Sequence, residues 1–433
     1  MSTRRTLLAA LGLIAVALAG PGFADETCQS PYLPKIVGQE DFVYVWTLGV
    51  DGWGDGSDKL VAIGANPAHP DYGKVVSTAS VGGRHEAHHG GFTDDRRALW
   101  VGGLDDSAIF VFDVASDPAH PKLVKRIDDF AAHTGGVVGP HTFYPLPGRM
   151  LISALSNAKD NGGRTALVEY NNAGEFVRTL WMPAGAEYGY DVRVNADLGR
   201  MLTSSFTGRD NYMRPLPDLL KDAAAMKRFG NTMVVWDHHT MKPLQTLAVP
   251  GAPLEIRWAL QPEHHYAFTA TALTARLWGV FLQPDGTFAA VDLAPIGDPA
   301  KAPLPVDISL SADDRHLFVS TFGDGNVRVF DVSDPRKPRE VLVQRIGGQV
   351  NMVSESWDGK RLYFTSSLLA NWDKTGADGE QFLRAYDWDG KALAPRFAVD
   401  FQQAQLGRPH IMNFGSLDFY RGRVASADRG AAP

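Results

Sequence analysis

The stretch Asp307-Ile308-Ser309-Leu310-Ser311-Ala312-Asp313-Asp314-Arg315-His316-Leu317-Phe318 contains the pattern that decides the fold. Alternating apolar residues precede a polar Asp-Asp-Arg turn and a second apolar segment follows it, which predicts two antiparallel strands joined by a short connection. Similar segments start near residues 89, 141, 191, 255, 307, 352 and 410, the last being a degenerate copy. A drifting repeat of roughly 50 residues that is filled with strands and Gly/Asp/Pro turns is typical of a β-propeller.

The rest of each repeat supports this interpretation. Several repeats continue into a third strand that ends in an aromatic residue and an aspartate, and residues 116–122 (SDPAHPK) closely match residues 333–339 (SDPRKPR). Seven repeat starts predict an all-β, seven-bladed propeller. The N-terminal strands around residues 42–46 and 60–63 should complete the blade whose inner strand carries His410, which would close the ring and remove its free edges. Residues 213–229 predict one short helical insertion, outside the ring and over one mouth.

The N-terminus and the composition indicate an exported protein. Residues 1–24 combine basic residues, an apolar run and a small-residue cleavage site, as a signal peptide does. Arg4-Arg5 fit either twin-arginine or ordinary secretory export, and the apolar run is too short for a membrane span. We therefore expect residues 25–433 to form a single periplasmic β-propeller domain. The net charge of −7 argues against nucleic-acid binding.

The repeat brings four histidines into register, although they are far apart in the sequence. In a propeller the first strand of each blade lines the central channel, so the repeat starts should face one axis. We expect a metal site there, and its predicted ligands are His88, His89, His141 and His410. Imidazole donors without thiolates suit copper, zinc, iron or nickel, and the only cysteine, Cys28, excludes a cysteine-rich site. Copper is expected before zinc in an oxidising compartment.

Three carboxylates fall at equivalent positions in the repeat: Asp191, Glu255 and Asp307. Buried carboxylates require partners, so we expect them to orient the imidazoles or to move protons. Met352 shares the register as a soft ligand or as packing. His85 and His133 are left open, whereas the pair His264-His265 falls in a turn at the rim and is assigned no metal role.

These stretches resemble the selenium-binding protein / methanethiol oxidase family. The resemblance rests on the motifs His88-His89-x-Gly-Phe, His141-Thr142, Gly189-Tyr190-Asp191, Pro253-Leu254-Glu255-Ile256-Arg257, Asp307-Ile308-Ser309-Leu310-Ser311, Trp372-Asp373-Lys374 and His410. It implies a copper-dependent oxidase that converts methanethiol, O2 and water to formaldehyde, hydrogen sulfide and hydrogen peroxide, with the same four histidines as ligands. The cysteine linked to selenium in animal members falls near Tyr72-Gly73, where this chain has glycine, so selenium binding is not expected.

Two other classes of function fit the sequence. One is a non-catalytic periplasmic propeller that acts as a binding module, and the other is a metal-dependent hydrolase or lactonase on the same scaffold. The sequence also leaves open the choice between copper and zinc, the physiological thiol, the carboxylate that moves protons and the oligomeric state.

Overall fold

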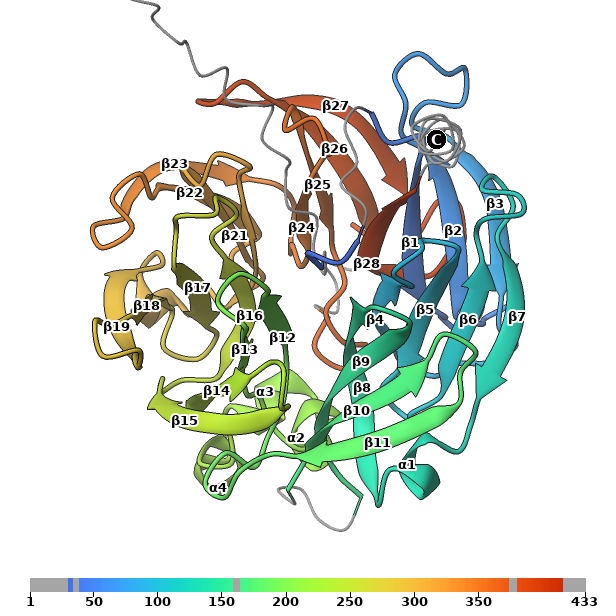
Figure 1. Ribbon diagram of the computed structural model, residues 1–433. Helices are drawn as coiled ribbons and strands as arrows, with labels where there is room; N and C mark the ends of the chain where they lie inside the picture. The colour runs from blue at the N-terminus through green and yellow to red at the C-terminus, as the bar shows by residue number, and fades with distance from the viewer. Residues whose placement is uncertain (1–29, 34–38, 159–163, 374–379, 416–433) are drawn as a thin grey trace, which may run out of the picture.

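The computed structural model is a ring of seven four-stranded antiparallel sheets (Figure 1), which confirms the predicted seven-bladed propeller. The structure describes residues 30–33, 39–158, 164–373 and 380–415. The predicted signal peptide and Cys28 lie outside these ranges. Among the described residues, no helix is long and apolar enough to cross a membrane.

Each blade contributes one strand to each of four concentric positions. The inner strands are β4 (Ala87–Phe92), β8 (Val137–Leu146), β12 (Val192–Asn195), β16 (Pro253–Trp258), β20 (Pro305–Leu310), β24 (Val353–Glu355) and β28 (Arg408–Gly415). The second strands are β5 (Ala98–Gly103), β9 (Arg149–Asn157), β13 (Arg200–Thr203), β17 (Tyr266–Thr271), β21 (His316–Thr321), β25 (Arg361–Thr365) and β1 (Phe42–Leu48). The third strands are β6 (Ile109–Asp113), β10 (Ala166–Asn171), β14 (Thr232–Asp237), β18 (Arg276–Leu282), β22 (Asn326–Asp331), β26 (Phe382–Trp388) and β2 (Lys59–Gly64). The outer strands are β7 (Lys122–Ile127), β11 (Phe176–Trp181), β15 (Lys242–Ala248), β19 (Phe288–Pro295), β23 (Arg339–Arg345), β27 (Leu393–Asp400) and β3 (Val75–Ser80).

The two ends of the described chain meet in one blade. Strand β28 takes the inner position and pairs antiparallel with β1, with Phe42 opposite Gly415 and Val45 opposite Met412. This pairing confirms the predicted closure, and it leaves no gap in the ring where an inner strand would lack a neighbour.

Burial falls from the axis to the rim. The inner and second strands are buried almost throughout, because both faces of each sheet pack against neighbouring blades. One such core joins Trp100 and Ile109 of one blade to Phe143 and Ile152 of the next. The outer strands are largely exposed, as in β7. Polar side chains on the inner strands are therefore enclosed by an apolar shell.

The predicted insertion, residues 213–229, contains two single helical turns, α3 (Leu216–Leu219) and α4 (Ala223–Met226), and a third turn, α2 (Arg209–Tyr212), comes directly before it. Pro215 separates α2 from α3, because a proline inside a helix removes a hydrogen bond, whereas Pro217 lies in the first turn of α3, where proline is tolerated. Tyr212 and Leu219 are buried in an apolar cluster with residues of several blades, so α2 and the insertion together cover one mouth of the channel. Two further turns are α1 (Phe130–His133) and the 3-10 helix η1 (Pro299–Lys301).

Candidate metal centre and apolar cavity

Backbone bulges direct the predicted ligands toward the channel. In β4, Ala87 pairs with Gly103 and Gly90 with Val101, so His88 and His89 together lie opposite the single residue Gly102. Adjacent residues of a regular strand point to opposite faces, whereas a bulge re-aims a side chain. The bulge therefore lets both histidines contribute to one site.

The same irregularity recurs in three other inner strands. His141-Thr142 lie opposite Ser153, Leu254-Glu255 opposite Ala270, and His410-Ile411 opposite Trp46. A further shift, between Pro305 and Asp307 of β20, inserts the extra residue Val306 beside Asp307. Register shifts at corresponding points of five blades indicate that the local backbone is built around the site.

A close approach of two inner strands supports this arrangement. A Cβ atom at Gly91 would lie 2.0 Å from the carbonyl oxygen of Phe143 in the next blade. Only glycine fits at this position. The glycine that follows His89 therefore allows β4 and β8 to bring their histidines together.

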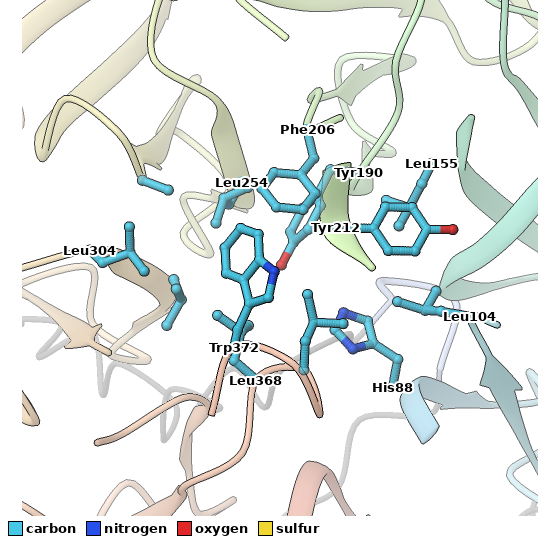
Figure 2. Close-up of a pocket in the computed structure, with 13 residues that line it drawn as sticks. His88, Leu104, Leu155, Tyr190, Phe206, Tyr212, Leu254, Leu304, Leu368 and Trp372 are labelled. Carbon is cyan, nitrogen blue, oxygen red and sulfur yellow. The ribbon is translucent and has the colours of Figure 1, made fainter. Parts of the chain in front are cut away.

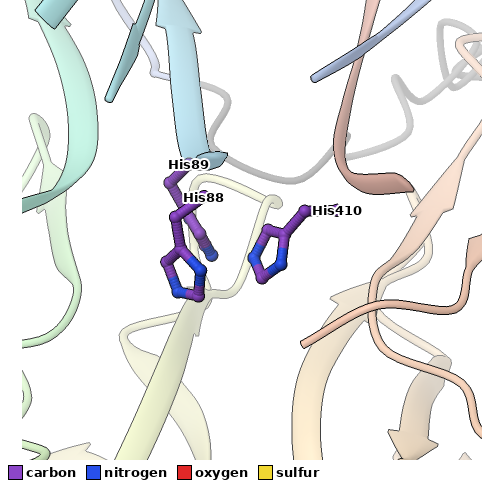
Figure 3. Close-up of side chains that lie close together, drawn as sticks. All are labelled: His88, His89 and His410. Carbon is purple, nitrogen blue, oxygen red and sulfur yellow. The ribbon is translucent and has the colours of Figure 1, made fainter. Parts of the chain in front are cut away.

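The four predicted ligands meet in one buried cluster. The ring centroids of His88 and His410 are 3.8 Å apart, and those of His89 and His141 are 4.0 Å apart. Figure 3 shows the imidazoles of His88 and His89, both from β4, facing that of His410 from β28. Two overlapping groups have donor atoms within 4.8 Å of one another: His88, His89 and His410, and His89, His141 and Glu255.

The donor set fits a metal ion. Nδ1 of His88 and Nε2 of both His141 and His410 are buried without a hydrogen-bond partner among the described residues. Leaving such atoms unpaired costs about 1–3 kcal/mol each, and coordination would remove that cost. Burial, followed by the neighbouring imidazoles, holds the pKa of His88 well below its usual range, and burial lowers the pKa of His410 to about 3. Both rings are neutral near pH 7, the state in which imidazole binds a metal.

Asn351, which precedes β24, and Ser367, which follows β25, hold His410 in place. The side-chain amide of Asn351 lies 3.2 Å from Nδ1 of His410 and donates a 2.5 Å hydrogen bond to the Ser367 carbonyl. The Ser367 N–H in turn donates to the carbonyl of Pro409 at 3.0 Å. The imidazole of His410 and the residue before it are therefore both fixed by these two residues.

Glu255 lies at the edge of the imidazole cluster within a buried ionic network. Its Oε1 is 3.7 Å from Nε2 of His89, and its Oε2 is 2.9 Å from Nη2 of Arg193 and 3.1 Å from Nη1 of Arg257. Burial, together with the charge of Asp191, raises its pKa well above the usual range, although the two guanidinium groups act in the opposite direction.

Asp191 and Asp307 contact the site through intermediate residues. Asp191 Oδ1 accepts a 2.9 Å hydrogen bond from Oγ1 of Thr142, and that hydroxyl lies 3.2 Å from Nδ1 of His141. Asp307 accepts from the backbone N–H of Val353 and pairs with Nη2 of Arg257 at 3.2 Å. Burial raises the pKa of Asp307 to about 6.

An apolar cavity lies directly against the imidazole cluster. His88 lines it together with Leu155 of β9, Tyr190, Phe206, Tyr212 of α2 and Trp372. Figure 2 shows the indole of Trp372, the phenol ring of Tyr190 and the imidazole of His88 arranged around the same cavity. The space open to the centre of a water-sized molecule is about 10 Å³, room for about one water.

The other histidines lie elsewhere. His264 pairs with Asp314 in a turn at the rim, as expected. His133, left open by the sequence, is half exposed on α1 and pairs with Asp129. His85 is buried, with Nδ1 2.6 Å from Asp106. Met352, also left open, packs in the apolar cluster of the closing blade.

Sequence reasoning missed the two arginines and the cavity. Arg193 and Arg257 each follow an acidic channel residue by two positions, and residues two apart in a strand share a face. An acidic-x-Arg pattern in two repeats was therefore a usable signal. Tyr212 and Trp372 lie in connections outside the repeat, so the alignment of the repeats could not predict their positions.

Known proteins are similar to this sequence over most of its length. The sequence model of the family described as "56kDa selenium binding protein (SBP56)" matches residues 22–418. A methanethiol oxidase of Ruegeria pomeroyi is 56% identical over 425 residues, covering 95% of this chain and 98% of the relative. A methanethiol oxidase of Hyphomicrobium sp. is 57% identical over 419 residues, covering 95% and 96%.

A solved structure shares the architecture. The X-ray structure of a hypothetical selenium-binding protein from Sulfolobus tokodaii has a TM-score of 0.77 and 23% sequence identity, covering 89% of this chain and 97% of that chain. At this identity the likeness shows the common propeller fold.

Proposed function

We propose that this chain, which belongs to the 56 kDa selenium-binding protein (SBP56) family, is a copper-dependent oxidase of small thiols. The proposed reaction converts methanethiol, O2 and water to formaldehyde, hydrogen sulfide and hydrogen peroxide, in line with the methanethiol oxidases that the chain resembles. The observation that carries the proposal is the contact between an apolar cavity and a buried cluster of imidazoles.

Copper is the proposed cofactor, because the donors are imidazoles and the reaction requires electron transfer. The ligands would be His88 through Nδ1 and His89, His141 and His410 through Nε2. Zinc suits similar donors but has no redox chemistry. When bound, copper would supply the electron transfer between the thiol and O2 that these side chains cannot provide.

The cavity would select and protect the substrate. Methanethiol has two heavy atoms, so its methyl group fits a space of about one water among aromatic and leucine side chains. Its sulfur would then face His88. Closure by Tyr212 and Trp372 excludes bulk water, which strengthens electrostatic interactions at the imidazole cluster.

Among the three candidate carboxylates, Glu255 is the proposed proton acceptor. Its Oε1 faces the imidazole cluster without a hydrogen-bond partner among the described residues, and the raised pKa suits a group that takes up a proton. Asp191 would orient His141 through Thr142, and Asp307 would hold Arg257, which fixes Glu255.

The test compares copper-loaded with zinc-loaded protein. Copper-loaded protein should consume O2 on addition of methanethiol and release formaldehyde, sulfide and peroxide in equal amounts, whereas zinc-loaded protein should not. Metal binding with no O2 uptake in either form would favour a hydrolase, and failure to bind metal would favour a non-catalytic binding module.

We also propose that the mature protein is periplasmic. Support comes from the N-terminal sequence and from the family match, which begins at residue 22, close to the expected cleavage after Ala24. N-terminal sequencing of protein from a periplasmic extract should begin at Asp25; an intact N-terminus in the cytoplasmic fraction would contradict export.

A further inference from the structure

One loop, residues 366–373 between β25 and β26, contacts both the imidazole cluster and the apolar cavity. The Ser367 N–H donates to the carbonyl of Pro409, the residue before His410, and the Ser367 carbonyl accepts from Asn351, whose amide lies 3.2 Å from Nδ1 of His410. The side chains of Leu368, Leu369 and Trp372 line the cavity. A displacement of this loop would therefore disturb both the ligands and the substrate chamber.

A single buried carboxylate holds the loop in shape. Asp373 Oδ1 accepts a 2.9 Å hydrogen bond from the Leu368 N–H, and its Oδ2 accepts a 2.7 Å bond from the Ser367 hydroxyl. The side chain is fully buried, and Oδ2 also lies 3.2 Å from Nη1 of Arg408. Arg408 begins β28, the strand that carries His410.

The same loop joins the cover of the chamber. The side chain of Asn371 donates a 2.7 Å hydrogen bond to the Met213 carbonyl, and the backbone carbonyl of Asn371 accepts from the Leu216 N–H at 3.3 Å. On the other side, the Ala370 N–H donates to Oε1 of Glu86, two residues before His88. The loop thus connects the insertion, β4 and β28.

We propose that Asp373 is a positioning residue for the metal centre, acting on His410 through Ser367 and Arg408. Ser367 contacts Pro409 directly and the His410 imidazole through Asn351, and Arg408 lies two residues before His410. Asp373 holds both Ser367 and Arg408 in place. Mutation of a residue that positions a metal ligand without binding the metal typically lowers metal affinity or activity by 10- to 100-fold. The inference rests on the proposed function for the identity of the metal.

The variant Asp373→Asn tests the role with little change of shape. The amide oxygen can still accept from the Leu368 N–H, but the NH2 group cannot accept from the Ser367 hydroxyl and carries no charge for Arg408. The variant Ser367→Ala removes one of these hydrogen bonds and leaves the Ser367 carbonyl in place, so it serves if Asp373→Asn fails to fold.

Asp314→Asn is the matched control. Asp314 is equally buried, accepts from the backbone N–H groups of Leu260 and Gln261 at 2.7 and 2.9 Å, and pairs with His264 at the rim. A purely structural effect of losing a buried carboxylate should appear in both aspartate variants.

The readouts are the affinity of the full mature chain for Cu(II), measured by competition with a chelator, and the electron paramagnetic resonance spectrum of the bound ion. Asp373→Asn should weaken binding on the order of 10-fold and alter the spectrum, with Ser367→Ala changing both in the same direction. Asp314→Asn should change neither.

Wild-type affinity and spectrum in folded Asp373→Asn, or in Ser367→Ala if the first variant is unfolded, would overturn the positioning role. Equal changes in Asp314→Asn would also overturn it. Copper binding that depends on Asp373 in a protein that does not oxidise methanethiol would support the positioning role and reject the proposed function.

Discussion

Enlarging the apolar cavity should change which thiols the protein accepts. Leu155 on β9 lines the cavity and is 1% exposed, so Leu155→Ala removes three carbon atoms from its wall. The native space of about 10 Å³ leaves no room for a propyl chain. In the variant, two further methylene groups could be buried at about 0.8 kcal/mol each. Together they correspond to a gain of about 15-fold in kcat/KM for propanethiol relative to methanethiol.

The control for this change is Leu310→Ala. Leu310 is fully buried in the core between the blades that contain β17 and β20, and it does not line the cavity. Both variants should lose about 2–5 kcal/mol of unfolding free energy, but only Leu155→Ala should change the ratio of kcat/KM values, measured by O2 uptake with each thiol. An unchanged ratio in folded Leu155→Ala, or the same change in both variants, would refute the assignment of the cavity to the alkyl group.

Three other perturbations give distinct results. Burial raises the pKa of Glu40 to about 7, so between pH 4.5 and 7 the folded chain retains a proton that the unfolded chain releases, and stability falls as pH rises. Glu40→Gln should remove this pH dependence, which is worth about 3 kcal/mol of unfolding free energy at most. The check is urea unfolding of both proteins at pH 5 and 8, and parallel profiles of unfolding free energy against pH would contradict the prediction. Gly91→Ala should cost about 1–3 kcal/mol and lower copper occupancy, because its Cβ would overlap the Phe143 carbonyl; native stability and occupancy would show that the strands can separate freely. Asp191→Asn should weaken Cu(II) binding on the order of 10-fold through Thr142 and His141, and unchanged affinity would remove Asp191 from the site.

The repeat pattern was enough to predict the ring, its closure and the convergence of His88, His89, His141 and His410. The alignment of the repeats placed these residues at one axis without any knowledge of side-chain direction. The bulges were not predictable, because strict alternation along β4 would send His88 and His89 to opposite faces. Only the paired register shows that two residues share one partner.

Features outside the repeat were less predictable. The ionic network was readable in principle, because Arg193 and Arg257 follow acidic residues at the spacing of one strand face. The cavity was not, since Tyr212 comes from the turn before the insertion and Trp372 from a loop whose packing depends on several blades. Likewise, the position of Asp373 beside the Trp372 motif gave no sign that its carboxylate holds the Ser367 hydroxyl and the Leu368 N–H.

The most direct test of the proposed metal centre combines elemental analysis with O2 uptake on purified wild-type protein and His141→Ala. His141 is fully buried and lies beside His88 but comes from a different blade. The substitution therefore deletes one proposed ligand and leaves the other three histidines in the chain. We predict one copper ion per wild-type chain with methanethiol-dependent O2 uptake, and loss of both in folded His141→Ala. Full thiol oxidation by His141→Ala in the absence of bound metal would contradict this prediction.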